Sequence, residues 1–89
     1  MPKISIKKKE KISEQILFYL YSQFPKQLFT AEIANELARD EEFIKEMLIG
    51  MEKKGLILKI TKNPNGISYI RRLRWRISNK AYNIYKQMQ

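Results

Sequence analysis

The chain has 89 residues, of which 44% are hydrophobic and 30% charged, and its formal net charge at pH 7 is +9. This length allows one small domain without a second core, and no apolar run reaches the roughly eighteen residues of a membrane-spanning helix. The chain contains no cysteine and no histidine. Their absence excludes disulfides, zinc sites built on these residues, and catalysis by a thiolate or an imidazole.

The sequence also lacks the other signatures of an enzyme. Its three glycines, Gly50, Gly55 and Gly66, stand apart and form no phosphate-binding loop. The charged N-terminus has neither the apolar segment nor the cleavage site of a secretory signal. We therefore expect an intracellular, cytoplasmic protein that is not an enzyme and that needs no cofactor and no metal. Its content of Lys, Ile and Glu indicates a thermophilic source.

The positive charge is concentrated at the two ends of the chain. Residues 1–29 contain six lysines and two glutamates, a net +4, whereas residues 30–55 contain four basic and seven acidic residues, a net −3. Residues 56–89 contain eight basic residues and no acidic one, a net +8. Basic ends around an acidic middle indicate a polyanionic partner that meets particular surfaces.

The N-terminal region predicts a basic arm followed by a helix. Residues 1–11 form the expected arm, and residues 12–89 the expected domain. Apolar residues recur every four positions from about Glu10 to Gln23, which predicts the first helix. Pro25 ends this helix. The arm contains five lysines, namely Lys3, Lys7, Lys8, Lys9 and Lys11.

Two further helices are predicted in the acidic middle. The stretch "QLFT" is long enough for one edge pairing in a sheet, and Thr30 is expected to cap a helix over residues 31–40. Asp40 is expected to cap a third helix over residues 41–55, whose acidic first turn and basic last turn suit the helix dipole and which Gly55 ends. The second helix would bury Ile33, Ala34, Leu37 and Ala38. The third would bury Phe43, Ile44, Met47, Leu48 and Met51.

The remaining sequence predicts a β-hairpin and a closing helix. "LILKITK" and "ISYIRRLRWRI" flank the turn "NPNG", and a four-residue loop would pair Leu58 with Arg71 and Leu56 with Leu73. The core face would then hold Leu56, Leu58, Ile60, Tyr69, Leu73, Trp75 and Ile77. The outer face would hold Ile57, Lys59, Thr61, Ser68, Ile70, Arg72, Arg74 and Arg76. Ser78 is the expected N-cap of the last helix, on which one face is formed by Ala81, Tyr82, Tyr85 and Met88.

This order of elements predicts an α+β fold and resembles that of winged helix-turn-helix proteins. "FTAEIANELARDEEFIKEMLIGMEKKGLI" resembles their helix-turn-helix segment, and "WRISNKAYNIY" resembles the end of the wing in MarR-, PadR- and ArsR-like regulators. The size and composition are similar to those of archaeal or archaeal-virus members. The resemblance implies a three-helix core, a β-hairpin wing and a C-terminal helix. It also implies binding of double-stranded DNA, with the third helix in the major groove and the wing at the adjacent minor groove or backbone.

The candidate nucleic-acid contacts are basic and polar residues of the arm, the third helix and the hairpin. Arginine suits phosphate because its planar fork binds two oxygens at once. The strand arginines could instead pair with Glu32, Glu36 and Glu46, which would fasten the hairpin to the helices. The candidates are Lys7, Lys8, Lys9, Lys45, Lys62, Asn65, Arg71, Arg72, Arg74 and Arg76.

The third helix departs from the pattern of a DNA-reading helix. Its outer face holds Lys45 but also Glu41, Glu42 and Glu46, which phosphates repel, although one carboxylate can accept from cytosine N4. Two alternatives to a DNA-binding regulator therefore stay open. One is a protein-interaction module that docks through its acidic third helix, and the other is an RNA- or ribonucleoprotein-binding module that uses the same basic face.

Aromatic residues on the first and last helices predict self-association. These two helices are rich in aromatic residues that look exposed, and only some of them are needed to cover the single core. The residues are Phe18, Tyr19, Tyr82 and Tyr85. We expect a homodimer through these two helices. Such a dimer would place two wings on one duplex and double the number of phosphate contacts.

Overall fold

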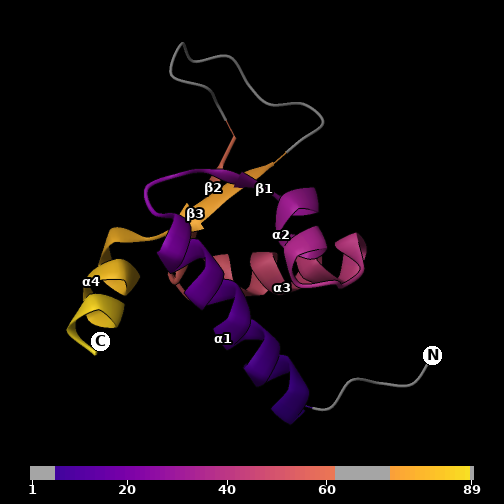
Figure 1. Cartoon of the computed structure of the whole chain (residues 1–89), viewed down its shortest axis with the longest axis horizontal. Helices are drawn as coiled ribbons and strands as arrows, with labels where there is room; N and C mark the ends of the chain where they lie inside the picture. The colour runs from indigo at the N-terminus through magenta and orange to yellow at the C-terminus, as the bar shows by residue number, and fades with distance from the viewer. Residues whose placement is uncertain (1–5, 62–72, 89) are drawn as a thin grey trace.

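The computed structural model describes residues 6–61 and 73–88, which form helices around a small sheet (Figure 1). The helices are α1 (Ile6–Gln23), α2 (Thr30–Glu36), α3 (Glu41–Lys53) and α4 (Asn79–Gln87). The strands are β1 (Leu28–Phe29), β2 (Ile57–Ile60) and β3 (Arg74–Ile77). The predicted order of helix, short strand, two helices, hairpin strands and helix is confirmed.

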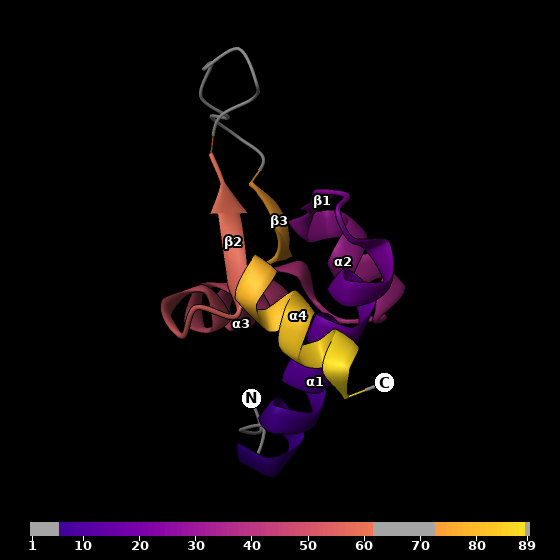
Figure 2. The ribbon, with the colours of Figure 1, turned by 90° about the vertical axis from the view of Figure 1, so that its left-hand side faces the viewer.

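The strands form an antiparallel sheet in the order β1-β3-β2, with β3 in the centre. Leu28 of β1 lies opposite Trp75, so the edge pairing expected for "QLFT" is present. On the other side of β3, Ile57 lies opposite Ile77 and Ile60 opposite Arg74. The sheet stands at one end of the helices, and α4 packs across α1 below it (Figure 2).

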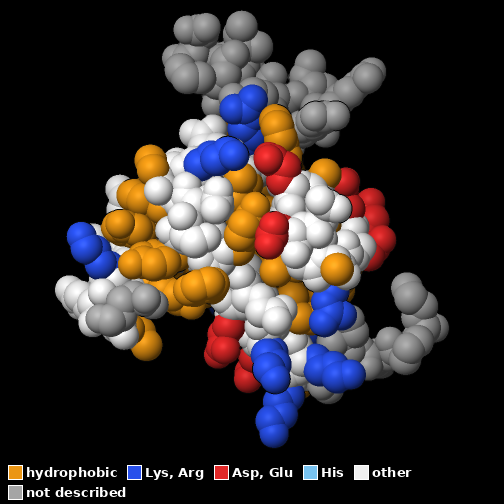
Figure 3. Space-filling view, viewed as in Figure 1, with side chains coloured by type: hydrophobic (Ala, Val, Ile, Leu, Met, Phe, Trp, Pro, Cys, Tyr) orange, Lys and Arg blue, Asp and Glu red, His pale blue; other side chains and the backbone are white. Residues whose placement is uncertain are grey.

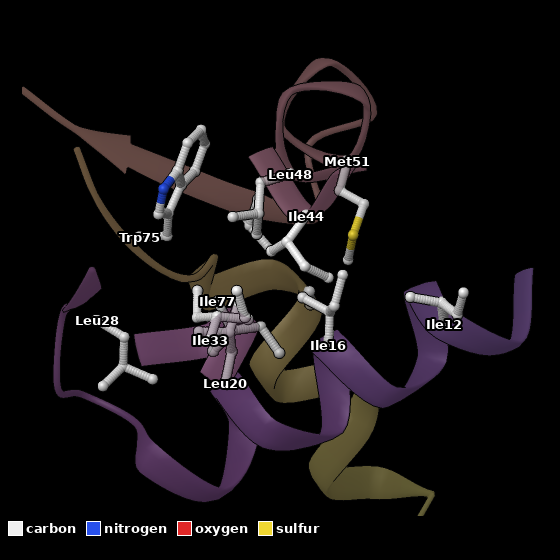
Figure 4. Packing of buried hydrophobic residues seen from close by; sticks show 13 residues of the cluster. Ile12, Ile16, Leu20, Leu28, Ile33, Ile44, Leu48, Met51, Trp75 and Ile77 are labelled. Carbon is white, nitrogen blue, oxygen red and sulfur yellow. The ribbon is translucent and has the colours of Figure 1, made fainter. Parts of the chain in front are cut away.

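One hydrophobic core joins the helices to the inner face of the sheet (Figure 4). Trp75 is fully buried, and its indole Nε1 donates a hydrogen bond of 2.8 Å to Thr30 Oγ1. The spacing of the strand therefore predicted the burial of Trp75 correctly. The buried members are Ile12, Ile16, Leu20, Leu28, Ile33, Ala34, Ile44, Leu48, Met51, Ile57, Trp75, Ile77 and Ala81.

Both polar caps predicted at Asp40 and Ser78 are confirmed. The Asp40 carboxylate accepts from the Phe43 backbone N–H at 3.0 Å and so satisfies a free donor of the first turn of α3. The Ser78 hydroxyl accepts from the Ala81 N–H at 3.1 Å and donates to the Gly55 carbonyl at 2.9 Å. Ser78 therefore caps α4 and also fastens its start to the end of α3.

The helix ends depart from the sequence prediction at three places. First, α1 begins at Ile6 rather than at about Glu10, so that Lys7, Lys8 and Lys9 lie in helical turns. Second, α2 ends at Glu36 and leaves Ala38 exposed, where burial was expected. The physical reason is that Ala38 adopts a left-handed backbone with φ of +53°.

Thr30 is the third departure, because it is the first residue of α2 and not its N-cap. The N-cap is Phe29, whose backbone N–H donates to the Glu32 carboxylate at 2.9 Å. Thr30 instead uses its hydroxyl to accept from the indole of Trp75. A contact between residues far apart in sequence has replaced the expected local cap.

The predicted hairpin register is wrong. Leu58 lies opposite Arg76 rather than Arg71, and this change turns β2 over relative to β3. Ile57 is therefore buried on the core face, whereas Leu58 is 38% exposed on the outer face. The alternation along β3 is as predicted, with Trp75 and Ile77 buried.

Candidate nucleic-acid interface

The outer face of the sheet presents two of the predicted basic residues. Because side chains alternate along a strand, burial of Trp75 and Ile77 places Arg74 and Arg76 on the opposite face. Both arginines are half-buried. Both lie on the central strand β3, flanked by the apolar outer residues of β1 and β2. They therefore form a short row of positive charge along the middle of this face of the sheet.

Aromatic rings support both guanidinium groups. The Cζ atom of Arg74 lies 4.7 Å from the centroid of the Phe29 ring, and that of Arg76 lies 5.7 Å from the centroid of the Phe24 ring. Arg76 also donates from Nη1 to the Ile77 carbonyl at 3.0 Å and to Asn79 Oδ1 at 3.2 Å. These contacts restrict the conformations of both arginine side chains and hold their positively charged groups against the surface of the protein.

The competing prediction paired these arginines with carboxylates of the helices. For Arg76, no such ion pair exists within the described part of the chain. One of the proposed partners, Glu32, accepts from the backbone N–H of Phe29. The charge of Arg76 is therefore available to an anion.

The start of α3 presents a mixed, mainly acidic surface. Lys45 is exposed, as predicted, but Glu41, Glu42 and Glu46 are exposed beside it. A groove of about 390 Å³ runs from this surface to the start of α2. The groove is lined by Phe29, Thr30, Ala31, Glu32, Glu41, Glu42, Lys45 and Leu73. Its carboxylates disfavour close approach of a phosphate backbone.

The N-terminal lysines lie away from the sheet. Lys7, Lys8 and Lys9 are exposed on the first turns of α1, whereas the sheet arginines lie beyond its C-terminal end. A space-filling view shows Lys and Arg side chains both at the sheet end and beside the N-terminal half of α1 (Figure 3). The predicted basic residues therefore form two surfaces rather than one.

Four of the predicted contacts fall on residues that the structure does not describe. Lys62, Asn65, Arg71 and Arg72 lie outside residues 6–61 and 73–88. One basic residue that sequence reasoning passed over is Arg39, which is exposed in the turn between α2 and α3. The sequence feature that could have identified Arg39 is its positive charge among the acidic residues around it.

An aromatic stack joins α1 to α4. The rings of Phe24 and Tyr82 stack at 3.9 Å between centroids, and Tyr21 lies 5.2 Å from Tyr82 and 5.0 Å from Tyr85. Phe18 continues the row, 6.5 Å from Tyr85. The outer end of this row is exposed and apolar, whereas its inner end at Phe24 lies under Arg76.

The acidic side chains of the described residues do not gather into a metal site, and one tyrosine has a shifted pKa. Within the described residues, no group of three or more acidic, His or Cys side chains could hold a metal ion. Burial, and then the carboxylates of Glu36 and Glu32, raise the pKa of Tyr19 above its ordinary value. Among the described helices, none is long and apolar enough to cross a membrane.

Comparison with known proteins identifies the fold. No family model matches the chain, and no curated protein matches its sequence. A mutant of MepR from a multidrug-resistant Staphylococcus aureus clinical isolate superposes with a TM-score of 0.68 at 21% identity, over 86% of this chain and 53% of that one. A ZitR mutant from Lactococcus lactis in apo form superposes with a TM-score of 0.70 at 22% identity, over 92% of this chain and 57% of that one.

The chain thus spans about half the length of the structures that it matches. ZitR is described as a zinc-responsive MarR family member. A third neighbour, another MepR mutant bound to an oligodeoxyribonucleotide, has a TM-score of 0.63 at 23% identity and covers 85% of this chain. The helices and the antiparallel sheet formed by the described residues therefore have the winged helix-turn-helix fold seen in MarR-family regulators, as predicted.

Proposed function

We propose that this protein binds double-stranded DNA and acts as a small transcriptional regulator inside the cell. The observation that carries the proposal is the pair of arginines on the central strand of a winged-helix sheet. Their guanidinium groups rest on aromatic rings, and the charge of Arg76 is not neutralised by a carboxylate among the described residues. A half-buried, restricted guanidinium loses little side-chain entropy when it binds phosphate.

The fold supports the same function. One structural neighbour, a MepR mutant, was solved bound to an oligodeoxyribonucleotide, and another MepR structure is in a DNA-binding conformation. In winged-helix proteins the wing and the preceding helix meet the duplex together. Here the phosphate contacts come from Arg74 and Arg76, and we expect Lys62, Asn65, Arg71 and Arg72, which lie between β2 and β3 in the sequence, to join them. Lys45 on α3 adds a further cation.

Affinity comes mainly from the phosphate backbone rather than from base reading. The carboxylates of Glu41, Glu42 and Glu46 at the exposed start of α3 oppose its deep insertion into a groove. Phosphate contacts bind any sequence and position the protein without specifying the site. Sequence preference is therefore modest, and binding weakens steeply as salt is added.

A charge-matched pair of variants tests this proposal. The double variant Arg74→Gln/Arg76→Gln removes two charges from the sheet, and Lys54→Gln/Lys86→Gln removes two exposed charges elsewhere. Affinity for a labelled DNA duplex is expected to fall by about tenfold or more in the first and by less than about threefold in the second, at roughly 1 kcal/mol per charged contact. Equal losses in both variants would contradict the proposal, because only overall charge would then matter. A parallel titration with duplex RNA tests the RNA-binding alternative.

The acidic groove favours a second candidate function. Glu32, Glu41 and Glu42 line the groove between α2 and α3 together with the apolar Phe29 and Leu73. This combination suits a basic, partly apolar protein segment, so that the domain would serve as a protein-interaction module. Absence of DNA binding by the wild type at low salt would favour this candidate.

The proposed regulator is a homodimer through α1 and α4. Phe18 is 55%, Ile84 50% and Met88 79% exposed on the adjoining surfaces of these helices. Apolar side chains at this exposure, next to the aromatic stack, form a patch that a second copy would cover.

A further inference from the structure

A hollow at the N-terminal end of α1 gathers cations from two distant parts of the sequence. Lys8 and Lys11 of α1 line it with Arg39, which lies in the turn between α2 and α3. The buried Ile12 and the exposed Gln15 complete its lining. The volume of the hollow is about 260 Å³. We refer to Lys8, Lys11, Gln15 and Arg39 as the basal basic site.

Helix geometry explains why these side chains share one surface. Lys8, Lys11 and Gln15 are three and four residues apart, so they follow one stripe of α1. Glu10 and Glu14 lie on another stripe and do not line the hollow. The left-handed backbone of Ala38 ends α2 and brings the next residue, Arg39, beside α1.

The cations of the basal basic site are accessible. Lys8, Lys11 and Arg39 are all exposed. Within the described part of the chain, the side chains of Lys11 and Arg39 make no hydrogen bond or ion pair. Like charges brought together on a surface repel one another, and a bound polyanion would relieve that repulsion.

This site is too far from the sheet to act as part of the same surface. Arg76 lies over Phe24, just beyond the C-terminal end of α1, whereas Lys11 lies near the N-terminal end of this helix. The sheet stands near the C-terminal end of α1, away from its start (Figure 1). The thirteen-residue step between Lys11 and Phe24 corresponds to about 20 Å along the helix at roughly 1.5 Å per residue. That distance is about two and a half Debye lengths at physiological salt, so the charges of the two basic surfaces are largely screened from each other.

Acidic side chains separate the two surfaces. Helix α2 runs from Thr30, which contacts the sheet through Trp75, to the turn that holds Arg39. The exposed carboxylates of Glu32 and Glu36 lie on this helix. A duplex laid from the sheet to the basal basic site along α2 would meet these carboxylates.

We infer that the basal basic site binds the phosphate backbone of a second DNA duplex, so that the protein bridges two DNA segments. This inference rests on the proposed binding of a first duplex by the sheet arginines. The chemistry is the same at both sites, since Lys and Arg neutralise phosphates and release counterions. The consequence is an architectural activity beyond occupation of a single site.

A capture experiment tests the bridging. One duplex is fixed to beads, the protein is added, and retention of a second, labelled duplex of unrelated sequence is measured beside single-duplex affinity. The variant Lys8→Gln/Lys11→Gln/Arg39→Gln loses phosphate contacts at the basal basic site only. Its affinity for a single duplex is expected to stay within about twofold of the wild type, whereas the amount of second duplex retained on the beads is expected to fall by about tenfold or more. The matched control Lys53→Gln/Lys54→Gln/Lys86→Gln, with the same loss of charge, is expected to retain capture.

The outcomes separate this inference from the proposed function. Unchanged capture by the triple variant would overturn the inference, because bridging would then come from two sheets of a dimer. A parallel fall in single-duplex affinity would also overturn it, because both surfaces would then hold one duplex. Failure of the wild type to bind any duplex would instead refute the proposed function. Arg39→Gln alone, at an exposed turn position, repeats the test if the triple variant does not fold.

Discussion

Two helices of this domain end in the same hydrogen-bond pattern with different residues at the left-handed position. At the end of α2, the Arg39 N–H donates to the Ala34 carbonyl and Ala38 has φ of +53°. At the end of α3, the Leu56 N–H donates to the Met51 carbonyl and Gly55 has φ of +78°. Both helix ends are Schellman motifs, in which glycine is the preferred residue at the left-handed position.

Replacing Ala38 with glycine is therefore expected to stabilise the protein. The left-handed backbone strains an L residue by about 1–2 kcal/mol, and the greater freedom of glycine in the unfolded chain offsets part of that gain. We expect the free energy of unfolding of Ala38→Gly to rise by about 0.5–1 kcal/mol. Urea denaturation measures this free energy, and a lower value for Ala38→Gly than for the wild type would show that Ala38 is not strained at this turn.

The reverse substitution at Gly55 is the matched control. A Cβ added at Gly55 meets no described atom within 4 Å, so any effect of Gly55→Ala comes from the backbone alone. We expect the free energy of unfolding to fall by about 1 kcal/mol in the same titration. An unchanged value would show that the helix end relaxes without strain.

Thr30 is expected to stabilise the fold through the hydrogen bond of its hydroxyl to Trp75 rather than by capping α2. Thr30→Val removes the acceptor of the fully buried Trp75 indole N–H while keeping the shape of the side chain. An unsatisfied buried donor costs about 1–3 kcal/mol, and the fluorescence of this one tryptophan reports the unfolding directly. Thr30→Ser keeps the hydroxyl and should lose less than about 1 kcal/mol. Equal losses would contradict the role of the hydrogen bond.

At the level of the elements, local signals in the sequence were sufficient for the helices. Asp40 and Ser78 cap their helices because capping involves residues only three positions apart. The four-residue apolar period of α1 likewise predicted the burial of Ile12, Ile16 and Leu20. The start of α1 was missed because its first turns hold lysines that no apolar stripe marks.

The sheet was predictable only in part, because strand pairing is not local. Along β3, arginines alternate with large apolar residues, so the buried face is unambiguous. In β2, the sequence "LILKI" places apolar residues on both faces, and the pattern cannot tell Ile57 from Leu58. Aromatic support of the arginines also escaped prediction, since Phe24 and Phe29 lie far from β3 in sequence.

The observed register is tested by two adjacent substitutions. Ile57→Ala is expected to cost about 2–5 kcal/mol, because Ile57 is fully buried, and its truncation leaves a cavity. Leu58→Ala removes an exposed side chain of equal size and should cost less than about 1 kcal/mol. Thermal or urea unfolding compares them, and the opposite order would restore the register predicted from sequence.

For the whole molecule, the apolar surface of α1 and α4 predicts the state of association. Phe18→Glu places a charge in the centre of the proposed dimer interface and is expected to convert a dimer to a monomer. Leu58→Glu places the same charge on an exposed apolar residue of the sheet and should leave the dimer intact. Sedimentation equilibrium distinguishes the two masses, and a monomeric wild type would refute the interface.

The charge distribution makes salt dependence the most direct test of DNA binding. Each phosphate contact releases counterions and contributes about 0.9 to the slope of log K against log salt concentration. The observed affinity of the wild type for a random duplex is predicted to fall with a slope of at least about three. In Arg74→Gln/Arg76→Gln the slope is expected to decrease by about two. No salt-dependent binding by the wild type, even at low salt, would contradict the account.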